Sequence, residues 1–158
     1  MDDEKGLLQA KKTFATMCEA LDDFKWHYEK NEEDLSINCK AQGDDLPMDI
    51  RVQVDAERQL VLLLSLLPFV TPEERRVEMA VAVSNANNLI VDGSFDFDVM
   101  SGRMLFRMTN SFLESELGKD VFAYLILCSC KTIDDFNDKF LMLSRGMMSL
   151  DQFMKLHS

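Results

Sequence analysis

The spacing of apolar positions predicts a helix at the N-terminal end of the chain and two strands after it. Apolar residues first recur every three or four positions, which is typical of one helix face: Leu7, Ala10, Phe14, Met17, Leu21, Phe24 and Tyr28. Apolar and polar residues then alternate over 35–41 and 48–54, with the turn-forming sequence QGDDLP between them. We therefore expect a first helix that includes Tyr28, followed by two strands that each bury one face.

The stretch LVLLLSLLPFV, Leu60–Val70, is apolar at every position except Ser65. A membrane-spanning helix needs ~20 apolar residues, about twice this length. Because the stretch follows two strands after a short polar link and ends near Pro68, it predicts a third strand over 59–67. We expect this strand to be central in the sheet and covered on both faces. Its two sides are Leu60, Leu62, Leu64 and Leu66, and Val61, Leu63, Ser65 and Leu67.

A second helix is predicted after TPEE, where Thr71 would cap it, Pro72 would be its first residue and Glu74 would complete a capping box. The sequence SFDFDVMSGRMLFRM then predicts a hairpin in which Gly102 takes a positive φ. One hairpin face is apolar. The other is a candidate interaction face on which acids and bases oppose each other across the strands: Asp96, Asp98, Arg103 and Arg107.

The chain is predicted to be helical from Leu117 onward. The segment 121–130, VFAYLILCSC, is apolar almost all round and should be deeply packed. Gly146, followed by a capping box of Ser149 and Gln152, predicts a break into two helices. The resulting order is α-β-β-β-α-β-β-α-α, an α+β fold with an antiparallel sheet of about five strands packed by helices. We expect residues 1–158 to form one domain.

Charge and cysteine content narrow the possible partners. The net charge is −11, with 28 acidic and 17 basic residues, which disfavours nucleic acid and anionic membranes. The N-terminal MDDEKGLLQA lacks the apolar run of a signal peptide, and four cysteines fit free thiols in a reducing compartment. These features predict a cytoplasmic protein. The 11 methionines are typical of an irregular core, and also of surfaces that adapt to different partners.

No motif for catalysis, a cofactor or a metal is found. The sequence DGSFDFDVMSGR resembles a calcium loop, but Phe97 and Arg103 occupy the positions that require Gly and Glu. On a helix, Cys128 and Cys130 point about 200° apart and cannot bind one ion. His27 is expected to mark the end of the first helix. We therefore expect no enzymatic activity.

The central part of the chain resembles the YbjN family, which is labelled a bacterial sensory transduction regulator. The matching stretches are LPFVTPEERR, AVSNANNLIVDGSFDFD and SGRMLFRM; the positions that carry the match are Leu67, Pro68, Val70, Glu73 or Glu74, Arg75, Arg76, Asn85, Asn88, Gly93, Phe95, Asp98, Gly102, Phe106 and Arg107. This family is similar in fold to the type III secretion chaperones. The resemblance implies a small acidic cytoplasmic protein, usually dimeric, that binds an extended segment of a protein partner and has no cofactor.

Two functions remain open from the sequence. One is a non-enzymatic protein-binding module, chaperone-like or adaptor-like, that forms a homodimer and uses an uncovered apolar strand face formed by Val61, Leu63 and Leu67. The other is a regulator that senses a small molecule in a pocket lined by Met and Phe. A third possibility is a closed monomer in which the C-terminal helices cover both sheet faces.

Overall fold

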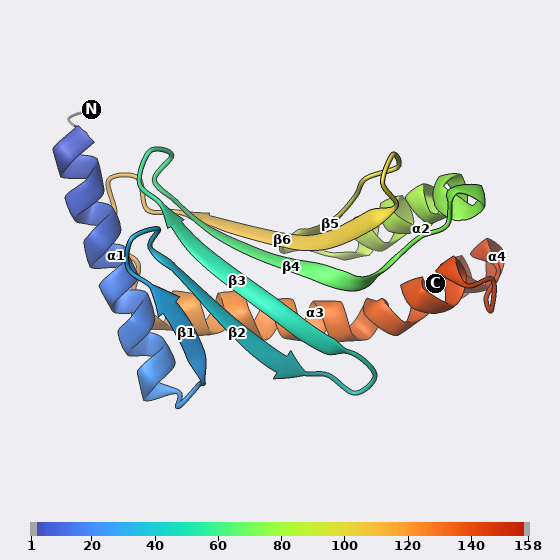
Figure 1. Cartoon of the computed structure of the whole chain (residues 1–158), viewed down its shortest axis with the longest axis horizontal. Helices are drawn as coiled ribbons and strands as arrows, with labels where there is room; N and C mark the ends of the chain where they lie inside the picture. The colour runs from blue at the N-terminus through green and yellow to red at the C-terminus, as the bar shows by residue number, and fades with distance from the viewer. Residues whose placement is uncertain (1–2, 157–158) are drawn as a thin grey trace.

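The computed structural model describes residues 3–156 and forms a six-stranded antiparallel sheet packed by helices (Figure 1). The elements are α1 (Asp3–Asp23), β1 (Tyr28–Asn31), β2 (Ser36–Gln42), β3 (Pro47–Asp55), β4 (Leu60–Val70), the 3-10 turn η1 (Glu73–Arg75), α2 (Arg76–Leu89), β5 (Ser94–Phe97), β6 (Arg103–Ser111), α3 (Lys119–Ser144) and α4 (Leu150–Lys155). The strand order is β1-β2-β3-β4-β6-β5, which places β4 in the interior of the sheet. The predicted α+β class is confirmed, with six strands instead of about five.

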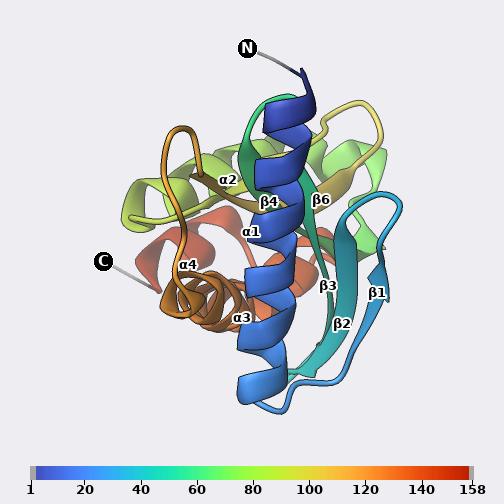
Figure 2. The ribbon, with the colours of Figure 1, turned by 90° about the vertical axis from the view of Figure 1, so that its left-hand side faces the viewer.

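The helices gather on one side of the sheet. In Figure 2, α3 and α4 lie to one side of β1, β2 and β3, α1 crosses the end nearest the viewer, and α2 runs across the upper part of the view behind it. The long helix α3 packs against β4 and β6, α1 packs against α3 and β3, and α2 packs against β5. Within residues 3–156 no helix covers the opposite side of the sheet, and we call that side the open face.

Strand alternation decides which residues enter the core. On β3, the predicted inward set Met48, Ile50, Val52 and Val54 is buried, as expected. At the other end of the sheet, Phe95 and Phe106 lie edge to face at 5.1 Å, and Phe140 contacts both Phe95 and Phe153 with ring centroids 5.0 and 5.2 Å apart. These aromatic pairs join β5, β6, α3 and α4 into one core.

The leucine-rich stretch is a strand, as predicted, but only one of its faces is covered. Its helix-facing side is buried and consists of Val61, Leu63, Ser65 and Leu67. The other side, Leu60 to Leu66, is half-buried or exposed. The expected partial cover of the sheet is therefore found, and the closed monomer, in which the C-terminal helices cover both sheet faces, is excluded for the described residues.

The first helix is shorter than predicted. It ends at Asp23, and the chain turns through Lys25, whose φ is +57°. The peptide N–H of Trp26 donates to the carbonyl of Leu21, which closes the turn at 3.0 Å. Tyr28 then begins the edge strand β1, and its hydroxyl donates to Asp22 at 2.8 Å. The apolar spacing continues past the true end of the helix, so it masked this short strand.

The start of α2 also differs from the prediction, because no capping box forms at Thr71 and Glu74. A 3-10 turn precedes the helix instead, and the Thr71 hydroxyl is buried without a hydrogen-bond partner among the described residues. The Thr71 backbone N–H donates to the carbonyl of Gly102 at 2.8 Å, which ties the end of β4 to the hairpin turn. Gly102 has the predicted positive φ, +75°, and a Cβ there would collide with the Thr71 carbonyl.

Two features of the second half join its elements. The Asn87 side chain both donates to the Phe95 carbonyl and accepts from the Phe95 N–H, each at 2.9 Å, and thereby fixes α2 to β5. The predicted break at Gly146 and the Ser149–Gln152 capping box are both confirmed. The expected deep burial of the whole segment 121–130 is wrong, since Tyr124 and Leu127 are more than half exposed on the outer side of α3.

Neighbouring leucines on β4 give a direct test of the two faces. We expect Leu63→Ala to lower the free energy of unfolding by about 2–5 kcal/mol, because it opens a cavity in the core. We expect the matched control Leu62→Ala, on the open face, to lower the free energy of unfolding by clearly less. Chemical denaturation measures both. Equal losses for the two variants would contradict the one-sided cover of the sheet.

Candidate protein-binding site

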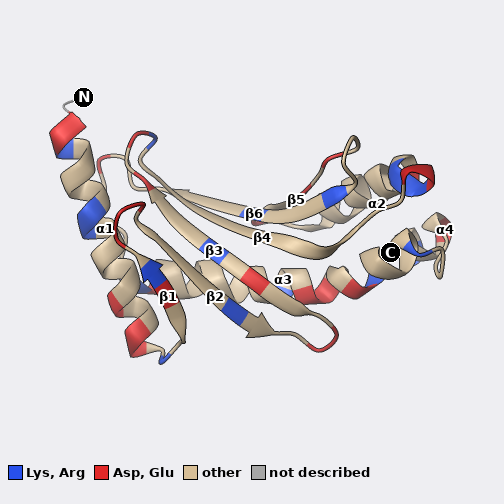
Figure 3. Ribbon diagram, viewed as in Figure 1, with Lys and Arg blue, Asp and Glu red and all other residues tan. Residues whose placement is uncertain are grey.

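The centre of the open face is a row of leucines on β4. We call Leu60, Leu62, Leu64 and Leu66 the leucine ridge; its last member is 49% exposed. Figure 3 shows β4 as a band without charge between the charged positions of β3 and β6. At about 3.3 Å per residue the ridge is about 20 Å long. A row of large apolar side chains that other elements leave uncovered is typical of a protein contact.

Two arginines stand beside the middle of the ridge. In the sheet register, Leu64 lies between Arg51 of β3 and Arg107 of β6. Arg51 donates to Asp34 at 2.8 Å, and Arg107 pairs with Asp96 at 2.9 Å. The Ser36 hydroxyl and then Arg51 donate to Asp34 and hold the pKa of its carboxyl below the usual value. Each guanidinium carries five donors, so both arginines keep donors for a further acceptor.

The open face is electrically balanced although the chain is acidic. Its strands carry four bases and four acids at outward positions: Lys40, Arg51, Arg103 and Arg107, and Glu29, Asp49, Asp55 and Asp96. These charges sum to zero, whereas the whole chain carries −11. The strands of this face therefore add nothing to the net negative charge of the chain, although Asp34 in the β1–β2 turn places one further acid beside Arg51.

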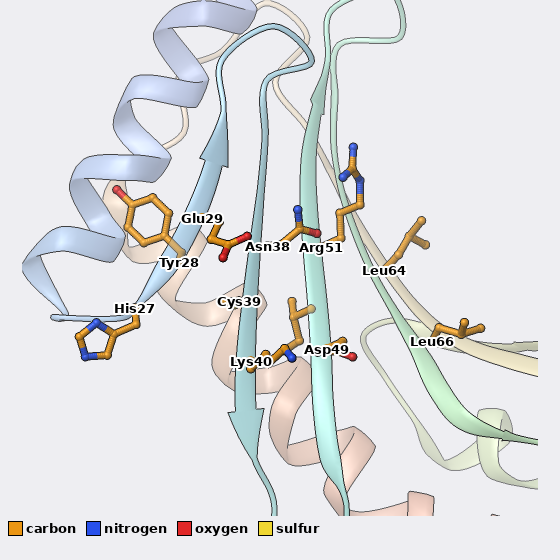
Figure 4. Close-up of a pocket in the computed structure, with 11 residues that line it drawn as sticks. His27, Tyr28, Glu29, Asn38, Cys39, Lys40, Asp49, Arg51, Leu64 and Leu66 are labelled. Carbon is orange, nitrogen blue, oxygen red and sulfur yellow. The ribbon is translucent and has the colours of Figure 1, made fainter.

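Two shallow hollows border the ridge. One, of about 570 Å³, is lined by residues of four adjacent strands and the segment before β1, including Asn38, Lys40, Arg51, Leu64 and Leu66 (Figure 4). The other, of about 690 Å³, lies toward the β3–β4 turn and includes Arg58, Leu60, Leu62 and Arg107. Ridge and hollows form one surface with an apolar centre and a charged border, the usual arrangement in a protein interface.

The thiol beneath this region is not activated as a nucleophile. Burial raises the pKa of the Cys39 thiol to about 11, so it stays protonated at neutral pH and is a poor nucleophile. His27 is exposed at the start of β1. Within residues 3–156, no group of three or more His, Cys, Asp or Glu side chains could hold a metal ion. In the same part of the chain, no helix has the length and apolar character needed to cross a bilayer.

The structure corrects the predicted apolar binding face. Val61 and Leu63 are fully buried and Leu67 is 3% exposed, all under the helices, so none is available to a partner. The side chains that a partner can reach belong to the alternate positions of β4, the leucine ridge. Alternation alone shows that a strand has two faces but not which one the helices cover.

The four residues predicted to share one hairpin face have different roles in the structure. Asp96 and Arg107 form an ion pair on the open face beside the ridge. The carboxylate of Asp98 instead accepts from the Met100 N–H at 2.9 Å and from the Ser101 hydroxyl at 2.6 Å, so it fixes the turn. Arg103 is exposed, and its backbone carbonyl accepts from the Asp98 N–H at 2.9 Å. The sequence analysis did not single out Arg51, because its position beside Leu64 depends on the β3–β4 register.

The role of Asp98 in the turn predicts a pH-dependent stability. Hydrogen bonds from the Ser101 hydroxyl and the Met100 N–H hold the pKa of Asp98 below its usual value. The ionised carboxylate therefore stabilises the fold above the ordinary aspartate pKa, and the contribution disappears as the pH falls through the lower folded value. We expect Asp98→Asn to melt below wild type at neutral pH and the difference to close below about pH 4.

Thermal melts across this pH range measure the effect. Asp45→Asn, in the exposed β2–β3 turn, controls for the loss of one negative charge. If the difference in melting temperature between wild type and Asp98→Asn stays the same at low pH, the ionised carboxylate of Asp98 does not stabilise the turn.

Comparison of the structure with solved structures identifies its fold. Neither a family model nor a curated protein matches the sequence. YbjN from E. coli superposes with a TM-score of 0.58 at 12% identity, over 78% of this chain and 87% of YbjN. A chain of the ExsC–ExsE complex gives 0.53 at 15% identity, over 80% of this chain and 93% of that one. A chain of the HopA1–SchA chaperone–effector complex gives a TM-score of 0.44 at 14% identity, over 84% of this chain and 89% of that one.

These identities are far too low to transfer a function, but two of the superpositions have TM-scores above 0.5 and cover more than three quarters of both chains. The resemblance stated from the sequence is therefore found in the structure. This chain has the α+β fold shared by YbjN and a chain of the ExsC–ExsE complex.

Proposed function

We propose that the protein is a non-enzymatic, chaperone-like binding module that acts on a protein partner in the bacterial cytoplasm, as a single domain that forms a homodimer. The observation that carries this proposal is the leucine ridge, four large apolar side chains in the middle of a sheet face without a helix. Leaving such side chains in water is unfavourable, and a partner that covers them gains about 25 cal/mol for each Å² of apolar area buried. The fold shared with a chain of a two-protein complex supports the same function.

The face is a better site for a partner than the sheet edges are. The edge strands β1 and β5 have four residues each, and β1 carries Glu29 and Lys30, which discourage strand addition. Over Leu60–Leu64 the backbone of β4 is already paired with both β3 and β6, so only side chains are presented there. An extended segment would find no backbone partners there, whereas a helix satisfies its own.

The partner segment should therefore be an amphipathic helix. A helix rises 1.5 Å per residue, so about 13 residues match the length of the ridge. Its apolar stripe would cover the leucines, and acidic residues at the edge of the stripe would meet the free donors of Arg51 and Arg107.

The small-molecule sensor receives less support. Its expected pocket was lined by Met and Phe, but most of these side chains fill the core; among the most deeply buried are Phe95, Phe106, Phe112, Phe122, Phe140, Phe153, Met17, Met79 and Met104. The lining residues of the two hollows at the ridge include one Met, Met108, and no Phe, and both hollows are open to solvent.

Binding of a labelled model peptide tests the proposal. The probe is a Leu-rich amphipathic helix with Glu beside its apolar stripe, and fluorescence anisotropy measures its affinity. We expect Leu64→Asp to weaken binding at least tenfold, because a central apolar contact is commonly worth 2 kcal/mol or more. Val81→Asp, on an exposed position of α2, is the matched control and should bind like wild type. Equal affinity of wild type and Leu64→Asp for the peptide would overturn the proposal.

A second peptide with Lys in place of Glu tests the arginines. We expect wild type to prefer the Glu peptide, and the double variant Arg51→Glu/Arg107→Glu to prefer the Lys peptide. The same preference in both proteins would exclude these arginines from the site.

A further inference from the structure

A small hollow of about 290 Å³ lies between α3 and the end of α2. Residues 89–91, Leu-Ile-Val, line it together with Tyr124 of α3. Phe136 also lines the hollow and is itself packed, with its ring centroid 5.7 Å from that of Phe95 and 6.0 Å from that of Phe140. The hollow is therefore built into the packed structure. Its size suits one side chain better than a drug-sized ligand, whose pockets usually measure about 300–1,000 Å³.

Large apolar side chains around the hollow are left in water. Val91 is 95% exposed, Leu89 is 46% exposed and Tyr124 is 52% exposed. The Tyr124 hydroxyl donates to Asp92, which holds the ring in place before any ligand binds. A fixed ring loses little side-chain entropy on association. A group of exposed apolar side chains around one hollow is typical of a contact with another protein.

The charged residues that line this hollow are both acids. Asp92 and Asp135 line it, and among the described residues no lysine or arginine does. Each of the other three hollows compared has two basic side chains in its lining: Lys40 and Arg51, Arg58 and Arg107, and, beside α1 and β1, Lys11 and Lys30. Because a concave surface that carries one sign of charge concentrates the opposite sign, this hollow favours a cation.

Both carboxylates can accept further hydrogen bonds. Asp92 accepts from Tyr124 and has no ion pair within the described part of the chain. Asp135 accepts from Lys131, one turn before it on α3, at 3.0 and 3.2 Å. The two side chains of this pair are 50% and 76% exposed, and such pairs contribute little stability. A carboxylate has about four acceptor positions, so each of the two can receive an incoming donor.

We propose that this hollow binds the arginine side chain of a basic protein segment in which apolar residues flank the arginine. The guanidinium would donate to Asp92 and Asp135 and lie against the ring of Tyr124. The methylene groups of the arginine and the flanking residues would cover residues 89–91. This site goes beyond the partner site on the open face, because Tyr124 and Asp135 line neither hollow at the ridge.

Arginine suits the hollow better than other cations do. Its planar guanidinium carries five donors, so it can bond two carboxylates while it stacks on a ring. The lysine ammonium is a compact, strongly hydrated charge that cannot stack in this way. A metal ion is disfavoured, because within residues 3–156 no group of three or more His, Cys, Asp or Glu side chains could hold one. The net charge of −11 also attracts basic segments from a distance.

An NMR titration of methyl signals with short peptides measures weak binding and locates it. The probe is Gly-Ser-Leu-Arg-Leu-Ser-Gly, which we call the Arg peptide. One comparison peptide replaces the arginine with citrulline, its uncharged isostere, and the other replaces both leucines with serine. We expect the Arg peptide to shift the methyl signals of Ile90 and Val91 and to leave those of the leucine ridge unchanged. It should bind about tenfold more tightly than the citrulline peptide and about threefold more tightly than the serine peptide, and added salt should weaken it.

Variants of α3 test the role of each group. We expect Asp135→Asn to weaken binding of the Arg peptide about threefold, and Lys131→Ala to tighten it, because Asp135 then loses its competing partner. Asp45→Asn and Lys5→Ala make the same charge changes at exposed positions elsewhere and should bind like wild type. Tyr124→Leu should bind more weakly than Tyr124→Phe, which keeps the ring and loses only the hydroxyl. Thermal melts confirm that each variant is folded.

Four results would each overturn the inference: no binding of the Arg peptide at millimolar concentration, equal affinity for the Arg peptide and either comparison peptide, methyl shifts confined to the leucine ridge, or a Lys131→Ala variant that binds no more tightly than Lys5→Ala. Asp92 is left unchanged in these tests because it also lines one hollow at the ridge. Leu64→Asp should bind the Arg peptide like wild type, and Asp135→Asn should bind the Glu peptide like wild type. Failure of this site is thereby distinguished from failure of the partner site.

Discussion

The structure depends on one packing constraint: β4 is apolar on both sides, and the helices cover only one of them. Val61, Leu63 and Leu67 meet α3 and its neighbours, and this contact organises the core. The leucines of opposite parity are left on a face whose strands carry equal numbers of acids and bases. A strand that only needed to fill the core would carry polar residues at those positions, as β3 does with Asp49, Arg51 and Gln53. The excess of leucine therefore indicates contact with a partner.

The sequence predicted most elements because their signals are local. Alternation located β2 and β3, a short apolar run after them located β4, and glycine and capping signals located the turn at Gly102 and the break before α4. Errors arose where tertiary contacts decide the outcome. Helical spacing through Tyr28 concealed β1, which exists because it pairs with β2. Thr71 forms no cap because its backbone is held by the hairpin turn. The covered side of β4 cannot be read from alternation, since both sides are apolar.

The open face is held by the sheet and by the core beneath it. It presents side chains of interior strands, and sheet hydrogen bonds fix β4 to β3 and to β6. On the opposite side of the core, aromatic pairs that include Phe140 connect α3 with the sheet and α4. The open face therefore needs no moving part to receive a partner.

Solvent accessibility of individual methyl groups tests the central claim most directly. A paramagnetic gadolinium chelate in solution broadens NMR signals of methyl groups that it can approach. For the protein without a partner, we predict strong broadening of the leucine-ridge methyls and protection of Val61, Leu63 and Leu67. Equal protection of both sets would show that the open face is covered and would contradict the account.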